Sequence, residues 1–293
     1  MQREPILTTV FSDGENGGNP APVFLAADAL TDEEMRQAAA AFGMEAVFVT
    51  AAKTPGCGAA LRYFTPDHEL TSCGHATVAA VTVLVEEGLL TGSSALLETA
   101  GGPVPVSWER TTDGILVMTG QSPPEFRADA PDKEALAAAL GIPVSALAGG
   151  AECVSTSRWK LLVPVCDRAA LDAIDLDDEA LFAACDACGC SGFYVFCRDE
   201  SEANAFFARQ FPLRSGYRED PATGVAAAAL GAWAAARGQL ETQGDHARVT
   251  VRQGYAMGRP SLLIVDLDLA GGAVAGVRVC GYAKRIDFVT ALG

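Results

Sequence analysis

Apolar and polar positions alternate along this chain in short segments, a pattern that predicts strands separated by turns. In the first half the segments are "ILTTVF", "APVFLA", "AVFVTAA" and "AALRYFT". The helix "TDEEMRQAAAAFG" interrupts them, because Thr31 and Glu34 have capping-box spacing and Gly43 is suited to end a helix. The second half has "WKLLVPV", "GFYVFC", "NAFFARQF", "ARVTVRQG" and "SLLIVDLDL", and a helix from about Asp178 to Gly189. We therefore expect an α+β fold.

Two alanine-rich helices are apolar or small on nearly every side: "HATVAAVTVLVEE" and "VAAAALGAWAAAR". Each is preceded by one glycine and followed by a second at the same interval, Gly74 and Gly88 in the first helix, Gly224 and Gly238 in the second. An Arg-x-Phe segment comes before each, Arg62 to Phe64 and Arg209 to Phe211. Chance similarity of alanine-rich helices is the alternative to an internal repeat at this point.

A helix that is apolar all round must be enclosed, and a curled sheet is the natural enclosure when strands flank it. We therefore predict two pseudo-symmetric lobes, each a curled, mostly antiparallel, barrel-like sheet around a central helix. The N-terminal lobe is expected at 1–118 and the C-terminal lobe at 119–280. A C-terminal strand at about 281–293 is expected to cross back to the first lobe.

The glycine-led starts of these two helices predict an anion site. The first turn of a helix leaves backbone N–H groups unpaired and carries partial positive charge, and glycine lets a ligand approach closely. If the lobes face each other, one carboxylate is expected to lie between Gly74 and Gly224. Such a site would bind a small acid without a lysine or an arginine.

Composition narrows the classes of partner. The chain has 293 residues, with 21 Lys+Arg against 37 Asp+Glu and a formal charge of -16, which repels phosphate backbones and anionic lipid surfaces. We expect no nucleic-acid partner. No stretch reaches the roughly 18 apolar residues of a membrane span, and the start "MQREPILTTVF" lacks the regions of a secretory signal. We therefore expect no membrane partner and a cytoplasmic location.

Nine cysteines are an odd number, spread too widely for a secreted disulfide scaffold, so reduced thiols are expected. The cluster "CDACGC", with Cys185, Cys188 and Cys190, has spacing similar to that of metal ligands. A fourth ligand has no candidate nearby, and "EALFAACDACG" is typical of an amphipathic helix that ends at Gly189. We therefore predict buried thiols that act as small apolar residues, and no metal.

Several motifs together resemble one known family. "GGNPAPVF", "GMEAVFV", "RYFTPDHELTSCGHATVAA", "EDPATG" and "RQGYAMGRPSLL" occur in the order and at about the spacing of the phenazine-biosynthesis PhzF-like proteins. These belong to the diaminopimelate epimerase fold superfamily, and the resemblance covers nearly the whole chain. It implies two lobes of sheet around central helices, a cleft between them, commonly a homodimer, and proton transfer on a small carboxylic acid without a cofactor.

The resemblance implies three catalytic residues. It places the general acid/base glutamate at Glu45. In a dry cleft, apolar neighbours disfavour the charged form of a carboxylate, which suits it to take up a proton. The residue pattern alone instead favours a solvated turn residue at this position. His75, in "GHAT", is implied to donate to the substrate or to relay a proton. Asp220 is implied to contact substrate, while Asp followed by Pro221 is also typical of a helix N-cap.

The predicted substrate-binding set is Asn19, Cys73, Gly74, Thr223, Gly224 and Val225. Asn19 is also a simple turn former before proline, and Cys73 is either a packing residue or an assisting acid. Relatives commonly have "DPATGS" where this chain has Val225, which removes a hydroxyl and puts the hydroxylated phenazine precursor in doubt as a substrate. Two-thiol racemisation is excluded, because no cysteine lies between Cys197 and Cys280.

The leading hypothesis is a cofactor-independent isomerase that moves a proton and a double bond in a small unsaturated, cyclic amino or carboxylic acid. Glu45 carries the proton on one face of the substrate, in specialised-metabolite or antibiotic biosynthesis. One alternative is an epimerase in which Glu45 and Cys73 or His75 act as opposed bases. The other is a non-catalytic binding protein on the same scaffold.

Overall fold

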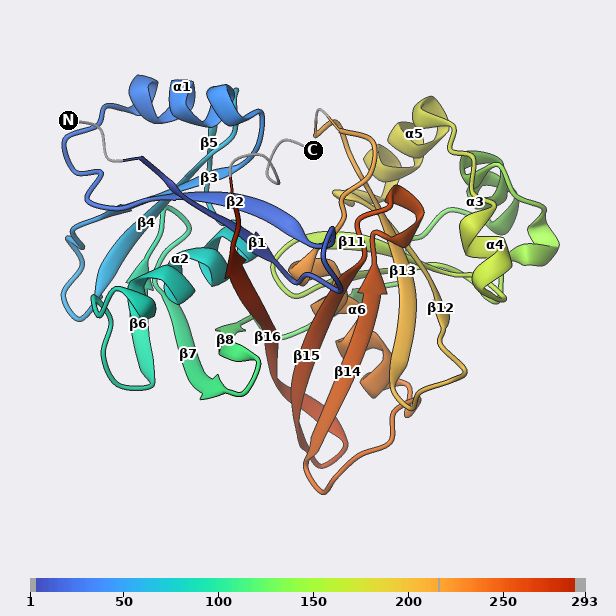
Figure 1. Ribbon diagram of the computed structural model, residues 1–293. Helices are drawn as coiled ribbons and strands as arrows, with labels where there is room; N and C mark the ends of the chain where they lie inside the picture. Colours follow the sequence, from blue (N-terminus) through green and yellow to red (C-terminus); the bar gives the residue numbers. More distant parts are fainter. Residues whose placement is uncertain (1–3, 216, 288–293) are drawn as a thin grey trace. The chain divides into compact units, whose positions relative to one another are not determined.

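The structure, a computed structural model, describes residues 4–215 and 217–287 and divides the chain into two compact units (Figure 1). Unit 1 ends at Gly120 and takes up the chain again at Cys280. Unit 2 runs from Gln121 to Val279. These junctions lie within two residues of the positions expected from the sequence, after residues 118 and 280.

Unit 1 is a curled sheet around the helix α2 (Gly74–Glu86). Its strands follow one another in the order β1 (Ile6–Val10), β2 (Asn19–Phe24), β3 (Ala46–Thr50), β4 (Ala59–Phe64), β6 (Ser94–Glu98), β7 (Val104–Thr111) and β8 (Gly114–Gly120), and β5 (Glu69–Leu70) pairs with β4. The helix contacts β1, β2, β3, β4 and β8, so strands from both ends of this order reach it. The helix α1 (Asp32–Phe42) packs on β3 and β4.

Unit 2 encloses the helix α6 (Gly224–Ala236) in the same way. Its strands are β9 (Glu125–Arg127), β10 (Glu152–Ser155), β11 (Trp159–Pro164), β12 (Gly192–Arg198), β13 (Ala205–Pro212), β14 (His246–Gln253), β15 (Ser261–Ala270) and most of β16 (Ala273–Arg285). The remaining elements are α3 (Lys133–Leu140), α4 (Arg168–Asp172), α5 (Asp178–Cys188) and the 3₁₀ turns η1 (Val144–Ala146) and η2 (Tyr255–Met257). The central helix contacts β10, β11, β14 and β15.

The strand pairing repeats from one unit to the other. In unit 1, β2 pairs with β3 in parallel, β3 with β4 antiparallel, β4 with β6 in parallel and β6 with β7 antiparallel. In unit 2 the same sequence of pairings joins β11, β12, β13, β14 and β15. The central helix lies at the same place in each series, after β4 and after β13. The predicted pair of related lobes is thereby confirmed.

The two Arg-x-Phe segments repeat in atomic detail. Arg62 donates from Nε and Nη2 to the two oxygens of Glu69, both at 2.8 Å. Arg209 donates in the same way to Glu219, at 3.0 and 2.8 Å. Each guanidinium also lies over the phenylalanine two residues later, 5.0 Å from the ring of Phe64 and 4.9 Å from that of Phe211. The similarity of the two halves is therefore an internal repeat.

Local signals set the helix limits as predicted. Thr31 and Glu34 form the capping box of α1, and Gly43 ends this helix in the left-handed conformation at φ 65°. Gly189 ends α5 in the same conformation. Within the described residues, no helix is long and apolar enough to cross a membrane.

The repeated arginine pair gives a test of burial. Both side chains of the Arg209–Glu219 pair are about one-eighth exposed, at 13% and 12%, against 29% and 31% for Arg62 and Glu69. We expect Arg209→Leu to lower the free energy of unfolding by about 3 kcal/mol, because it leaves a buried carboxylate unpaired. Arg62→Leu is expected to cost about 1 kcal/mol. Urea unfolding of both variants checks this, and equal losses would contradict the role of burial.

Candidate active site

Three of the predicted site residues meet at the start of α2. Cys73 is the N-cap of this helix, His75 lies in its first turn, and Glu45 lies directly before β3. The Cys73 thiol donates to Oε2 of Glu45 at 2.9 Å, and His75 Nε2 lies 3.7 Å from the same oxygen. Cys73 Sγ is also 3.5 Å from His75 Nδ1. One carboxylate oxygen is therefore shared by two groups that can give or take a proton.

This cluster is mostly buried. The side chains of Glu45 and His75 are 21% and 11% exposed, and Cys73 is 7% exposed. Glu45 therefore does not extend into bulk water, contrary to the interpretation of a solvated turn residue. Reduced solvation strengthens each electrostatic contact in the cluster, and it leaves only a limited opening through which a substrate atom can approach.

The fold positions the three side chains through a short chain of contacts. Gly43 ends α1 and the chain turns into β3, where Ala46 pairs with Phe64 of β4. The buried hydroxyl of Tyr63 is 2.7 Å from Thr77 Oγ1, which donates to the backbone oxygen of Cys73 at 2.8 Å. Burial also raises the pKa of Tyr63, so that its phenol keeps its proton. The β3–β4 pair thus holds both Glu45 and the helix start.

The same trio has ligand atoms within 4.8 Å of one another, a spacing that a metal ion accepts. A carboxylate, a thiol and an imidazole are all known ligands of zinc. The thiol–carboxylate contact at 2.9 Å is, however, that of a hydrogen bond from the thiol to the carboxylate. The arrangement suits acid–base chemistry, with the thiol and the imidazole both directed to one oxygen of the carboxylate.

In unit 2 Asp220 lies one turn before α6. The helix begins at Gly224 and its N-cap is Thr223, so the interpretation of Asp220 as an N-cap is wrong. Instead, Asp220 accepts two hydrogen bonds from the residues that follow it. The hydroxyl of Thr223 donates to Oδ2 at 2.5 Å, and the backbone N–H of Ala222 donates to Oδ1 at 3.4 Å.

Two buried side chains that the sequence analysis did not single out hold this loop in place. Gln253, at the end of β14, donates from Nε2 to the backbone oxygen of Asp220 at 2.6 Å and to Thr223 Oγ1 at 3.0 Å. Tyr194 donates its hydroxyl to Gln253 Oε1 at 2.9 Å. The signal in the sequence is the alternation of β14, in which Gln253 takes the next inward position after the buried Ala247, Val249 and Val251, directly before Gly254, whose backbone is left-handed at φ 79°.

Two cations also act on Asp220, and sequence reasoning missed both. Lys160 of β11 is only 5% exposed, and burial lowers its pKa to about 8, opposed by the negative charge of Asp220. Burial likewise lowers the pKa of Arg259, again opposed by Asp220. The sequence analysis expected the anion site to bind an acid without lysine or arginine. It therefore left out Lys160 and Arg259, which lie near Asp220 in unit 2. Lys160 lies in "WKLLVPV", and the strand pattern of this segment does not predict that the lysine is buried near Asp220.

The starts of the two central helices differ from those of the outer helices. Side chains of Thr31, Asp132, Asp167 and Asp177 cap α1, α3, α4 and α5. In the described chain, neither Cys73 nor Thr223 caps its own helix with its side chain. Gly74 has open space where a Cβ would lie, which leaves its backbone accessible. At Gly224 a Cβ would approach Val279 to 3.1 Å, so glycine is also favoured there by packing.

The structure gives the positions of two other predicted contact residues, Asn19 and Val225, but it does not test their roles. Asn19 begins β2, opposite Val10 of β1, and it is half-buried. Val225 is half-buried in the first turn of α6, and its backbone oxygen accepts from Thr156 Oγ1 at 3.4 Å. Contact of these residues with a substrate stays a prediction. The same holds for a carboxylate shared by the two helix starts.

Comparison with known proteins gives a consistent result over the whole chain. A family model described as phenazine biosynthesis-like protein (PhzC-PhzF) matches residues 8–286. A curated relative, an uncharacterized isomerase of Deinococcus radiodurans, is 34% identical over 279 residues, which are 93% of this chain and 89% of the relative. The structure of a phenazine biosynthesis protein of the PhzF family from Bacillus anthracis is 26% identical, covers 98% of each chain and has a TM-score of 0.88.

A more distant structure shares the fold alone. A probable proline racemase from Agrobacterium radiobacter K84 is 14% identical, with 97% of this chain and 91% of that chain covered and a TM-score of 0.62. The likeness supports the predicted epimerase-like architecture of sheets around central helices. It carries no conclusion about substrate.

Lys160 predicts how stability depends on pH. Its pKa is about 8 in the folded protein and 10.5 as the ordinary value, so between these values the unfolded chain binds more protons at this residue. The free energy of unfolding should therefore rise with pH across this window, by up to about 3 kcal/mol, and this contribution should level off below pH 8, where both states hold the proton.

The Lys160→Met variant should lack this rise, while variant Lys133→Met, at an exposed lysine of the same unit, should keep it. Urea unfolding at a series of pH values from 7 to 11 measures the difference. A wild-type and a Lys160→Met curve that run parallel would contradict the burial of the ammonium group.

Proposed function

Because the chain belongs to the phenazine biosynthesis-like family, a family of isomerases, we propose that it moves a proton and a double bond in a small unsaturated acid, without a cofactor. The proposed substrate is a cyclic amino or carboxylic acid, and Glu45 is the proton carrier. A place in specialised-metabolite or antibiotic biosynthesis and assembly as a homodimer belong to this proposal, and only the family resemblance supports them.

The observation that carries the proposal is the shared oxygen of Glu45, with Cys73 Sγ at 2.9 Å and His75 Nε2 at 3.7 Å. In the proposed reaction the carboxylate takes a proton from one carbon, and the C–H electron pair passes into the adjacent unsaturated system. The double bond shifts, and the same proton returns to a second carbon. Cys73 and His75 orient the carboxylate and exchange protons with it.

The spacing supports transfer on one face of the substrate. Two opposed bases must each come within about 3 to 3.5 Å of the same carbon, so their reacting atoms lie roughly 6 to 7 Å apart. The reactive atoms of Glu45, Cys73 and His75 all lie within 4.8 Å of one another. These three residues are therefore better placed to act as one proton carrier with two assisting groups than as two opposed bases of an epimerase.

Substrate binding is proposed to use the starts of the central helices. Backbone N–H groups at Gly74 suit a carboxylate, because the glycine leaves the approach open. Asp220 is proposed to orient or relay through its two oxygens, which the loop before α6 holds in place. Val225 offers an apolar branch where relatives commonly have serine, and it suits a ring without a hydroxyl at that point.

Variant Glu45→Gln should lower proton exchange by about 10²-fold to 10⁴-fold, because an amide cannot accept the proton. The substrates are a panel of cyclic amino acids with one ring double bond, starting with the dehydroprolines. Incubation in deuterium oxide and mass spectrometry measure deuterium incorporation. The matched control is Glu109→Gln, at an exposed glutamate of the same unit, which should exchange at the wild-type rate.

Circular dichroism and thermal unfolding should show that both variants keep the fold. Exchange in Glu45→Gln as fast as in the wild type would refute Glu45 as the carrier. The absence of exchange in the wild type across the panel would refute this substrate class.

Cys73 separates the two isomerase mechanisms. If the Cys73 thiol only orients the carboxylate, Cys73→Ala should slow deuterium exchange by about 10-fold to 100-fold, because one hydrogen bond to a charged group is lost. Cys73→Ser should recover part of the loss, because a hydroxyl can also donate. If Cys73 is instead an opposed base, Cys73→Ala should lose as much deuterium exchange as Glu45→Gln. In that case the wild type should also make a saturated substrate lose its optical activity.

A further inference from the structure

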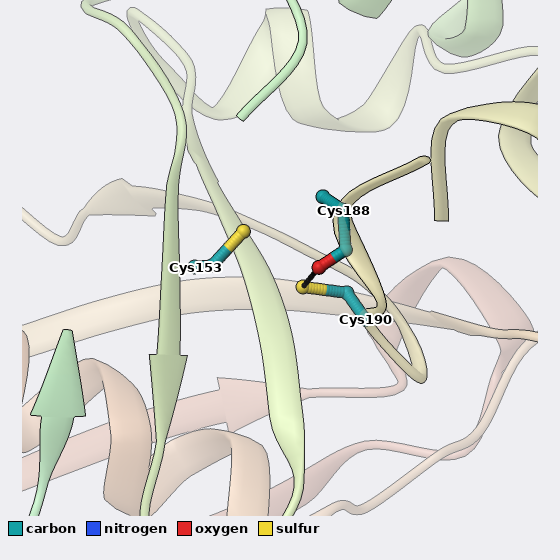
Figure 2. A group of neighbouring side chains, drawn as sticks. All are labelled: Cys153, Cys188 and Cys190. Carbon is teal, nitrogen blue, oxygen red and sulfur yellow. Dashed lines mark hydrogen bonds between the residues drawn. The ribbon is translucent and has the colours of Figure 1, made fainter. Parts of the chain in front are cut away.

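Three thiols from two separate parts of the sequence meet inside unit 2. Figure 2 shows the sulfurs of Cys153 and Cys190, with Cys188 beside them. Cys188 is the last residue of α5, Cys190 lies in the loop before β12, and Cys153 lies on β10. Their sulfur atoms all lie within 4.8 Å of one another. All three are free thiols, 0 to 2% exposed.

The backbone brings these sulfurs together by regular means. Gly189, left-handed at φ 64°, ends α5 and turns the chain back, and the N–H of Cys190 donates to the oxygen of Cys185 at 3.0 Å. From the other side, Cys153 pairs with Leu161 of β11, the strand next to β12. Figure 2 shows the sulfur of Cys153 directed toward the loop that carries Cys190.

The sequence alone offered no further ligand near "CDACGC". In the structure Cys153, which is distant in the sequence, supplies one. Metal–sulfur bonds of about 2.3 Å in a trigonal plane place three sulfurs about 4 Å apart, within the observed spacing. Among the His, Cys, Asp and Glu side chains of residues 4–215 and 217–287, no fourth lies within that spacing of all three. A tetrahedral site would need a fourth ligand, whereas a soft monovalent cation accepts three thiolates.

A positive side chain lies beside the loop. Arg127 donates from Nη2 to the backbone oxygen of Cys188 at 2.6 Å, and its guanidinium lies 3.9 Å from the ring of Trp159. Its Nε is 3.5 Å from Asp129, which offsets part of the charge. A nearby cation is favourable, because three thiolates and one monovalent metal carry net negative charge in a dry interior.

We propose that Cys153, Cys188 and Cys190 form a three-coordinate site for a soft closed-shell cation, with Cu(I) as its best fit. On binding, three S–H bonds break, three metal–sulfur bonds form, and three protons pass to solvent, with no change in oxidation state. The ion would join the end of α5 to β10, a structural role separate from the Glu45 cluster.

Anaerobic titration of the full-length, reduced protein with Cu(I) against a chromophoric Cu(I) chelator tests the site. The wild type should bind one equivalent tightly, with a rise in Tm. Cys153→Ser and Cys188→Ser should each weaken that equivalent by on the order of 100-fold or more. Cys197→Ser, which removes another buried thiol of the same unit, should leave it unchanged.

X-ray absorption of the wild-type complex gives a readout that does not depend on the variants. Three sulfur neighbours at one distance support the proposal, and two sulfurs or a nitrogen ligand overturn it. Unchanged affinity in both serine variants would show adventitious thiol binding. One tight equivalent of Zn(II) with four ligands, in place of Cu(I), would also refute the three-coordinate site.

Discussion

Enclosure of a helix without a polar face is the constraint on which both units depend. In α2 every residue from Ala76 to Val85 is buried, and in α6 most residues are alanine or glycine. Such a helix is stable in water only where strands cover it on all sides, and small side chains let the strands come close. At Gly231 even a methyl group would approach Val265 to 3.1 Å. Only the helix ends then remain for a ligand, and the N-terminal end carries the positive partial charge.

Elements with strong local signals could be predicted from the sequence. The capping box at Thr31, the terminal glycines and the alternating strand segments fix structure within a few residues of themselves, and the helix limits agree. The internal repeat was visible for the same reason, since the spacing of Gly74 and Gly224 from their terminal glycines is a local property. Its confirmation came from pairings between strands, which no single segment contains.

Contacts between distant segments could not be predicted from such signals. Glu45 and Cys73 are 28 residues apart, and the pairing of β3 with β4 brings their segments together. Lys160 looks like an ordinary strand residue until β11 is seen packed on α6. At Asp220 a local signal was misleading, because Asp-Pro suits an N-cap although the helix begins only at Gly224. The resemblance to a family supplied Glu45, His75 and Asp220, and residue patterns alone favoured other roles for each.

The repeat also places different chemical groups at equivalent positions of the two units. In both units the N-cap side chain bonds to a carboxylate and leaves its own helix uncapped, Cys73 to Glu45 and Thr223 to Asp220. A thiol ionises far more readily than a hydroxyl, so the pair in unit 1 is the better suited of the two to take up and release a proton near neutral pH. Asp220 is instead fixed by hydrogen bonds and lies in the field of Lys160 and Arg259. Equivalent positions thus carry a thiol–carboxylate pair in one unit and, in the other, a hydroxyl–carboxylate pair that lies near two cations.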